Sequence, residues 1–242
     1  MNIFIGELIG TMLLVLLGDG VVANVQLEKS KGQNSGWIVI AAGWGFAVAV
    51  GVYVAGWASG GHLNPAVTIG MAVLGKLPVA QVPLYLVAQF LGGFLGAVLV
   101  WLAYLPHWSQ TTDPTAKLAI FCTVPAIRKP LANLLCEVIG SAVLLIGVLG
   151  ILNRNNDIGS GVGPCAVGLL VFSIGLSLGG PTGYAINPAR DLAPRFAHAC
   201  LPIPGKGSSD WGYAWIPVLG PILGGVVGAL LYNGLFNGLP PL

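Results

Sequence analysis

Two copies of the triplet Asn-Pro-Ala, at residues 64–66 and 187–189, carry the side chains whose types and spacing are most suggestive of chemistry. Asparagine is a preferred helix N-cap and proline a preferred first helical residue, so each triplet predicts the start of a helix. If the amide oxygen accepts from a backbone N–H in the first turn, the side-chain NH2 keeps two donors free. The pair Asn64 and Asn187 would therefore form a double hydrogen-bond donor site.

The composition places these triplets in a membrane. The chain has 242 residues, of which 55% are hydrophobic and 7% charged, and a mean hydropathy of +0.86, whereas a soluble domain carries roughly 25% charged residues. The net charge of +2 is too small to indicate a nucleic-acid partner. Phosphate-binding, dinucleotide, zinc and nucleophile-elbow motifs are absent from the sequence, so we expect no enzyme, no cofactor and no metal site.

Six stretches are apolar over about the 20 residues that a helix needs to cross the bilayer core. These predicted spans are residues 4–25, 37–57, 82–104, 131–152, 162–178 and 211–236. We expect residues 106–130 to form a long polar loop.

Two further segments, residues 64–74 and 187–199, read as helices of only about half the spanning length. Eleven residues rising about 1.5 Å each reach roughly 16 Å, which is close to the bilayer midplane. Non-helical backbone at that depth has to be buried in protein or line a wet cavity. The glycine-rich residues 58–63 and 179–184 therefore predict a water-filled path.

The two halves of the chain repeat one another. Residues 7–11, Glu-Leu-Ile-Gly-Thr, align with residues 137–141, Glu-Val-Ile-Gly-Ser, at an offset of 130 (137 minus 7). Residues 89–97 align with residues 221–229 at an offset of 132 (221 minus 89), and both segments contain a Gly-Gly pair. Such small-residue faces fit close helix packing, either within one chain or between subunits.

Each half, about residues 1–105 and 131–242, holds three spans and one half-helix. Because three is odd, the second half must cross in the opposite sense. The sequence thus predicts one all-α transmembrane domain, residues 1–242, built as an inverted repeat of six spans and two re-entrant half-helices.

The half-helices would meet near the midplane, where each N-terminus carries about half a positive charge and repels cations, including a protonated water chain. The two Asn residues would donate to a passing hydroxyl or water, and apolar side chains would form the opposite wall. Backbone acceptors would come from Gly60, Gly61, His62, Leu63, Gly183, Tyr184 and Ala185.

With Ser-Gly-Gly-His at residues 59–62 and Arg190 directly after the second triplet, the chain resembles the aquaporin superfamily along essentially its whole length, and specifically its glycerol facilitator branch. The resemblance implies a passive channel for glycerol and other small uncharged solutes, with some water, that excludes protons and ions. It also implies a homotetramer in the lipid bilayer of the plasma membrane, with both termini in the cytoplasm.

The same resemblance implies a selectivity filter of Trp44, Gly175, Tyr184 and Arg190. Gly175 leaves space where water-selective relatives place a histidine, and the two aromatic rings would form an apolar corner. An arginine near the bilayer interior costs a few kcal/mol and marks a pathway. The structural alternative is an ion pair with Asp191, which the different directions of adjacent helical residues disfavour.

One departure from the glycerol-conducting branch and several likenesses to it bear on the solute. Tyr184 replaces the phenylalanine common in the glycerol-conducting branch, so its hydroxyl would either narrow the filter or add a donor. Asp191, Arg195 and the pair Pro217-Val218 resemble that branch.

The remaining polar residues of the apolar segments have predicted structural roles. Glu7 and Glu137 occupy equivalent repeat positions, and we expect them to accept hydrogen bonds from the re-entrant loops. We expect His62 to support its loop or line the mouth of the path. Asp19 is expected in a vestibule. His107 and His198 are expected at loops or the membrane interface.

Two other functions use the same pattern: a water-selective channel, which Gly175 argues against, and a coupled secondary transporter, since transporters also contain inverted repeats and broken helices. Charge counting conflicts with the implied orientation, because it leaves most cations outside, against the usual bias. Lys76 and Arg154 would lie inside, and Lys29, Lys31, Lys117, Arg128, Lys129 and Lys206 outside.

Overall fold

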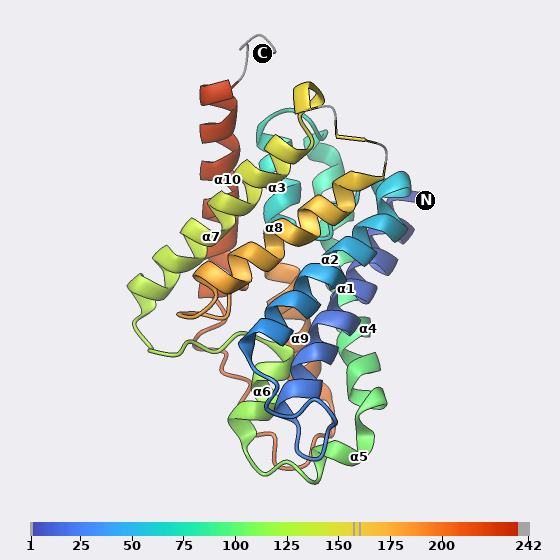
Figure 1. The fold of residues 1–242 in the computed structure, drawn as a ribbon, viewed down its shortest axis with the longest axis vertical. Helices are drawn as coiled ribbons and strands as arrows, with labels where there is room; N and C mark the ends of the chain where they lie inside the picture. Colours follow the sequence, from blue (N-terminus) through green and yellow to red (C-terminus); the bar gives the residue numbers. More distant parts are fainter. Residues whose placement is uncertain (1, 157, 160, 237–242) are drawn as a thin grey trace.

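The computed structural model describes residues 2–156, 158–159 and 161–236, so the predicted domain limits at residues 1 and 242 lie outside the described residues. Throughout these ranges the regular structure is helical (Figure 1). The main helices are α1 (Asn2–Gln26), α2 (Trp37–Ser59), α3 (Pro65–Val73), α4 (Val82–Ala103), α7 (Pro130–Ile151), α8 (Val162–Leu178), α9 (Pro188–Cys200) and α10 (Ile216–Phe236).

The predicted membrane architecture is confirmed. Among the described residues, five helices, α1, α2, α4, α7 and α10, are long and apolar enough to cross a membrane. The predicted fifth span, α8, is apolar but has only 17 residues. The sixth span starts later than predicted, because residues 211–215 form turns and the helix begins at Ile216, beside Pro217, which is favoured in a first helical turn.

The predicted long polar loop at residues 106–130 is partly helical. This segment contains α6 (Pro114–Phe121) and most of a short helix, α5 (Leu105–Trp108). The Asp113 side chain caps α6 by accepting a hydrogen bond of 2.8 Å from the backbone N–H of Thr115, with Pro114 at the first helical position. The Asp-Pro pair is thus a helix start of the same kind as Asn-Pro.

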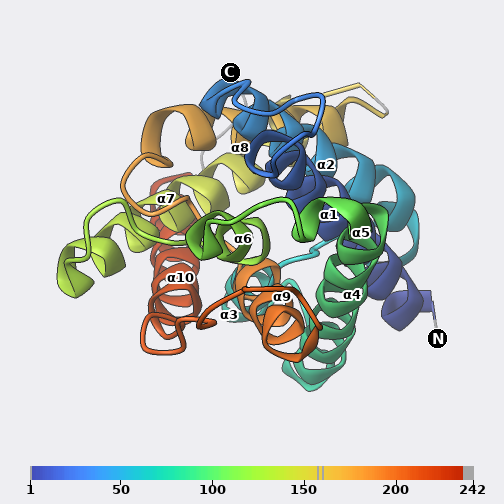
Figure 2. The same ribbon diagram turned by 90° about the horizontal axis from the view of Figure 1, so that it is seen from below.

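The contacts between helices repeat in the two halves. α1 packs against α2 and α4, and α7 packs against α8 and α10. Each half-helix is held by the other half, since α9 packs on α4 and α3 packs on α10. In the end-on view of Figure 2, α3 and α9 lie between α10 on one side and α4 on the other. The two halves therefore hold one another's half-helices.

Glycines allow this close approach. A Cβ atom on Gly92 would lie 2.3 Å from the carbonyl oxygen of Leu8, and one on Gly224 would lie 2.2 Å from that of Val138. The next glycine in each pair faces the half-helix of the other half. A Cβ on Gly93 or Gly225 would lie 2.9 or 2.8 Å from the carbonyl oxygen of the alanine in an Asn-Pro-Ala triplet. Both Gly-Gly pairs thus serve packing within the chain.

α1 begins and α10 ends in the upper part of Figure 1, whereas α5 and α6 lie at the opposite end. Several cations at this opposite end are bound within the protein. Lys117 donates to the carbonyl of Pro204, and Lys206 donates to three carbonyls near the C-terminus of α9, each at 2.7 Å. Arg128 donates two hydrogen bonds to the carboxylate of Asp210, and these bonds raise the pKa of Arg128. Three of the cations at this end therefore have partners within the protein, while the orientation itself stays a prediction.

Candidate pore and selectivity filter

Two re-entrant loops, residues 60–64 and 183–187, lead into α3 and α9. Their backbones match position by position at an offset of 123 (187 minus 64). The matched φ angles are 88° and 81° at Gly60 and Gly183, 65° and 40° at Gly61 and Tyr184, and 51° and 43° at Leu63 and Ile186. Repeated left-handed residues prevent helix formation, so these backbone groups need partners elsewhere.

Glu7 of α1 supplies partners for the first loop. Its carboxylate accepts from the backbone N–H groups of His62 at 3.0 Å and Leu63 at 2.7 Å. It also accepts from the Ser59 hydroxyl at 2.6 Å and from the Gln89 amide at 2.7 Å. The side chain is fully buried. Four hydrogen bonds therefore satisfy this buried carboxylate.

Glu137 of α7 does the same for the second loop. Its two oxygens accept from the backbone N–H groups of Ala185 at 3.0 Å and Ile186 at 2.9 Å. These two residues stand at the positions equivalent to those held by Glu7. Both carboxylates make the contacts that a brace for the loops requires.

The half-helices start as their sequence predicts. The Asn64 side-chain oxygen accepts from the backbone N–H of Ala66 at 2.8 Å, and that of Asn187 accepts from Ala189 at 3.0 Å and Arg190 at 3.2 Å. Proline occupies the first helical position in both. The N-termini of α3 and α9 therefore meet in the middle of the protein, where each cap contacts the loop of the other half.

The expectation of two free donors on each asparagine is wrong. The Asn64 amide donates to the carbonyl of Ile186 at 2.8 Å, and the Asn187 amide donates to the carbonyl of Leu63 at 2.8 Å. Each asparagine thus crosses to the loop of the other half and keeps one N–H for a solute. The crossed bonds also engage the Leu63 carbonyl, which the sequence suggested as a free acceptor.

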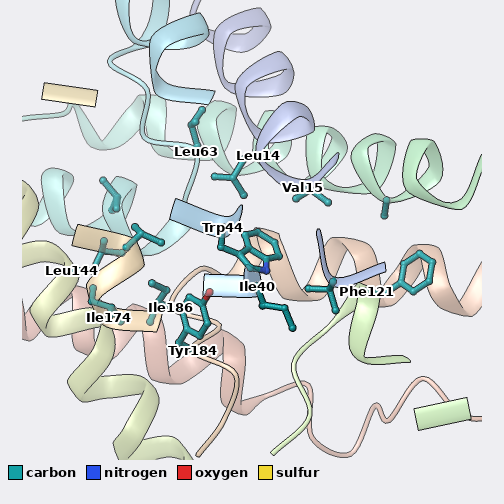
Figure 3. Packing of buried hydrophobic residues seen from close by; sticks show 14 of the residues in the cluster. Leu14, Val15, Ile40, Trp44, Leu63, Phe121, Leu144, Ile174, Tyr184 and Ile186 are labelled. Atoms are coloured by element: carbon teal, nitrogen blue, oxygen red, sulfur yellow. The ribbon is translucent and has the colours of Figure 1, made fainter. Parts of the chain in front are cut away.

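A cavity of about 220 Å³ runs along both loops. Its polar side holds Gly60, Gly61, His62, Leu63, Asn64, Tyr184, Ala185, Ile186, Asn187 and Arg190. Ile186 was not predicted, although it is the repeat equivalent of Leu63. Gly175 and Gly183 do not line the cavity. The opposite wall is apolar and includes Leu14, Val48, Val52, Val67, Met71, Leu144, Val148, Val167 and Val171. Figure 3 shows Leu14, Leu144, Ile186 and the two filter aromatics converging from several elements.

Two of the four predicted filter residues form a stacked pair. The guanidinium carbon of Arg190 lies 3.9 Å from the centre of the Trp44 ring, and both side chains are buried. The alternative of an Arg190–Asp191 ion pair is not what the structure shows. Asp191 instead pairs with Arg195, one helical turn later, at 2.9 Å.

The other two predicted filter residues also touch. A Cβ on Gly175 would lie 2.8 Å from Cζ and 2.9 Å from the hydroxyl oxygen of Tyr184. The space that Gly175 leaves is therefore filled by the Tyr184 phenol. Trp37 fixes this pair, since its Nε1 donates to the Gly175 carbonyl at 2.9 Å and its ring packs edge-on against Tyr184.

A buried network behind the filter includes Thr123, which no sequence signal marked. Thr123 donates to Asp191 through its backbone N–H at 2.7 Å and its hydroxyl at 2.6 Å. Arg195 donates to the Thr123 carbonyl at 3.2 Å and to the Ser209 carbonyl at 2.9 Å. A Cβ on Gly183 would lie 3.2 Å from the Thr123 methyl group. The network thus connects the segments around Thr123 and Ser209 to α9, and Thr123 also contacts the re-entrant loop at Gly183.

The remaining predictions have mixed outcomes. His62 lines the cavity and its Nδ1 lies 3.2 Å from the Thr68 hydroxyl, and His107 lies in the short helix α5. His198 is not at a loop or interface but is buried in α9, with its Nδ1 2.9 Å from the Ser209 hydroxyl. Asp19 is not in a vestibule, because it is fully buried.

Comparison with known proteins decides the family. A family model described as major intrinsic protein matches residues 1–232. The chain belongs to the major intrinsic protein family. It is 64% identical over 220 residues to a probable glycerol uptake facilitator protein of Thermotoga maritima, covering 91% of this chain and 93% of the relative. It is 56% identical over 220 residues to a glycerol uptake facilitator protein of Bacillus subtilis, covering 91% and 80%.

Two other known proteins are also similar to this chain. The X-ray structure of the aquaglyceroporin from Plasmodium falciparum superposes with a TM-score of 0.88 at 32% identity, covering 98% of this chain and 96% of that one. A D/L-lactic acid transporter of Lactiplantibacillus plantarum is 39% identical over 212 residues, covering 86% and 87%. Family membership and the membrane-length helices make the chain a multi-pass protein of the plasma membrane.

Proposed function

We propose that this protein is a passive channel for glycerol and similar small uncharged solutes, with some water, and not an enzyme. The observation that carries the proposal is the filter, where Arg190 stacks on Trp44 at 3.9 Å beside the buried ring of Tyr184. A guanidinium edge donates to hydroxyl groups while two aromatic rings contact carbon atoms. That combination matches a polyol, whose two sides are polar and apolar.

The function of the relatives agrees with this geometry. Proteins named as glycerol uptake facilitators share more than half of their aligned residues with this chain over most of its length. The apolar wall opposite the loops offers little to a bare ion, which would lose its hydration without replacement.

Exclusion of protons and cations follows from the centre of the cavity. Two half-helix N-termini direct partial positive charge there, and Asn64 and Asn187 each keep one N–H for the solute. A water or hydroxyl at this point has to accept from both asparagines, which interrupts a proton-conducting chain. Glu7 and Glu137 act as braces that fix the acceptor carbonyls of the loops.

The test is stopped-flow light scattering of proteoliposomes exposed to a gradient of glycerol or of an impermeant osmolyte. We expect rapid shrinkage followed by re-swelling in glycerol only, at a rate far above that of empty liposomes. Water flux without glycerol entry would instead support a water-selective channel. Since one relative is named a lactic acid transporter, undissociated lactic acid is the first competing solute to measure.

We also propose a homotetramer with one pore per chain. Large apolar side chains on the outer surface of the described helices, including Phe46, Trp57 and Leu131, need lipid or a neighbouring subunit as cover. Mass determination in native detergent complexes tests this state, and a monomer of unchanged activity would contradict it.

A further inference from the structure

Asp19 of α1 has no explained role. Its side chain is fully buried, and neither carboxylate oxygen has a hydrogen-bond partner among the described residues. An ionised carboxylate in this condition is costly unless a positive charge compensates it. The surroundings of Asp19 therefore have to supply either a counter-charge or a proton.

The surroundings of Asp19 lie directly behind the filter. α1 packs against α6 and α9, and the charged groups that act on Asp19 are Arg190, which attracts it, and Asp191, which repels it. The preceding residue, Gly18, is pressed against the indole of Trp44, because a Cβ there would lie 2.2 Å from the ring. The turn that carries Asp19 thus supports the ring on which Arg190 stacks.

The buried charges at this place divide into two sets. Asp191 and Arg195 neutralise one another directly at 2.9 Å. Arg190 makes no side-chain hydrogen bond or ion pair with another residue in the described part of the chain. All four groups act on the buried thiol of Cys122, so they share one small region. The two ionisable groups left over are the guanidinium of Arg190 and the carboxyl group of Asp19.

The internal repeat shows that the fold itself needs neither charge. At the offset of 130 the equivalent of Asp19 is Leu149 (19 plus 130), and at the offset of 123 the equivalent of Arg190 is Val67 (190 minus 123). Both equivalents are buried and apolar, and α3 packs on α7 as α9 packs on α1. The place where α1 meets α9 therefore carries an anion and a cation, whereas the equivalent place where α7 meets α3 carries two hydrophobic residues.

We infer that Asp19 is the counter-charge of Arg190 and a positioning residue of the filter. It acts across the protein interior, touches no solute, and sets the positive potential that Arg190 presents to the path. The inference rests on the proposed function, because a potential at the filter has an effect only if solutes pass there.

The experiment compares Asp19→Asn, which keeps the shape and removes the charge, with the unaltered chain in proteoliposomes. Chloride efflux and glycerol re-swelling are measured on the same preparations. We expect the ratio of chloride to glycerol permeability to rise at least about tenfold, because Arg190 would then be uncompensated in a medium of low dielectric constant. An unchanged ratio would overturn the inference. Absence of glycerol flux in the unaltered chain would instead overturn the proposed function.

A double-mutant cycle shows whether Asp19 acts through Arg190. Arg190→Val and Asp19→Leu copy the residues of the other half, singly and together, and thermal unfolding in detergent is followed for all four proteins. We expect Arg190→Val alone to be less stable than the unaltered protein. The double variant should recover most of this loss of stability, since charges removed as a pair leave no unpaired ion. Additive effects of the two substitutions would contradict the assignment, even if Asp19→Asn proved too unstable to reconstitute.

Discussion

The two re-entrant segments of this protein have the same scaffold and different side chains. Both start a half-helix with Asn-Pro, both repeat left-handed φ angles at equivalent positions, and both have two backbone N–H groups held by a glutamate. The differences that concern selectivity lie in and behind the filter. At the offset of 123 that relates the re-entrant loops, Trp44 and Arg190 of the filter end correspond to Val167 (44 plus 123) and Val67 (190 minus 123), and at the offset of 130 Asp19 corresponds to Leu149 (19 plus 130).

This division indicates which features build a pore and which select a solute. The symmetric features satisfy buried backbone groups, which any re-entrant segment at membrane depth needs. The asymmetric features place one cation and one aromatic face on one side of the midplane only. Tyr184 belongs to this second set, since it occupies a left-handed position where the other loop has Gly61, at a cost of about 1–3 kcal/mol.

The largest expected effect comes from removing a shared feature. Glu137→Ala leaves the backbone N–H groups of Ala185 and Ile186 buried without an acceptor, at about 1–3 kcal/mol each. We expect a large loss of thermal stability in detergent and at least a tenfold loss of glycerol permeability, in line with these energies. Glu7→Ala, which also strips an acceptor from Gln89, should be equally severe. A stable, conducting Glu137→Ala protein would show that the re-entrant loops do not depend on these glutamates.

Making the two halves alike at the filter is the next test. Arg190→Val copies Val67, and we expect it to conduct sodium and protons at least about tenfold faster because the fixed positive charge is gone. Glycerol should still pass. Lys76→Val is the matched control, because Lys76 is an exposed cation outside the cavity. Equal ion leak in both variants would show that Arg190 is not the selective charge.

A smaller and sharper effect is expected at Gly175. Gly175→Ala places a methyl group 2.8 Å from the Tyr184 ring, so the phenol has to move toward the path. We expect glycerol permeability to fall severalfold and water permeability to fall less, because a narrower filter hinders the larger solute more than the smaller one. Gly20→Ala is the control, since a Cβ there has no neighbour within 4 Å. An unchanged ratio of glycerol to water permeability would contradict this account of the filter.

The smallest effect is expected on the outer surface. Arg128→Gln breaks the pair with Asp210, but the Arg128 side chain is 51% exposed, and exposed pairs contribute about 0–1 kcal/mol. We expect a shift of at most a few degrees in the unfolding midpoint and unchanged glycerol flux. The buried Arg195, tested as Arg195→Gln, should lose far more stability. Similar losses of stability in both variants would show that burial does not determine how much these two arginines stabilise the protein.

Much of this fold could be predicted because the informative patterns are local. Asparagine before proline marks a helix start wherever it occurs, and apolar runs of spanning length mark membrane helices. The repeat of the glutamates at an offset of 130 then predicted two braces, although no sequence pattern could specify which N–H groups each would receive.

The errors arose where partners come from distant parts of the chain. The amide of Asn187 donates to Leu63, which is 124 residues away, so the number of free donors depends on how the loops meet. The filling of the Gly175 space by Tyr184 depends in the same way on two elements coming together. The helix α6 was missed for a different reason, because the Asp113-Pro114 start was present but was read as part of a polar loop.

We propose that solutes cross this protein passively, through a path whose selectivity lies at one end. The most direct test is the initial rate of labelled glycerol uptake into proteoliposomes, measured against glycerol concentration with and without sodium and pH gradients. We expect a rate that rises linearly, ignores both gradients, and ends at equal concentrations inside and outside. Uptake that saturates and accumulates glycerol when a gradient is imposed would show a coupled transporter and contradict the account.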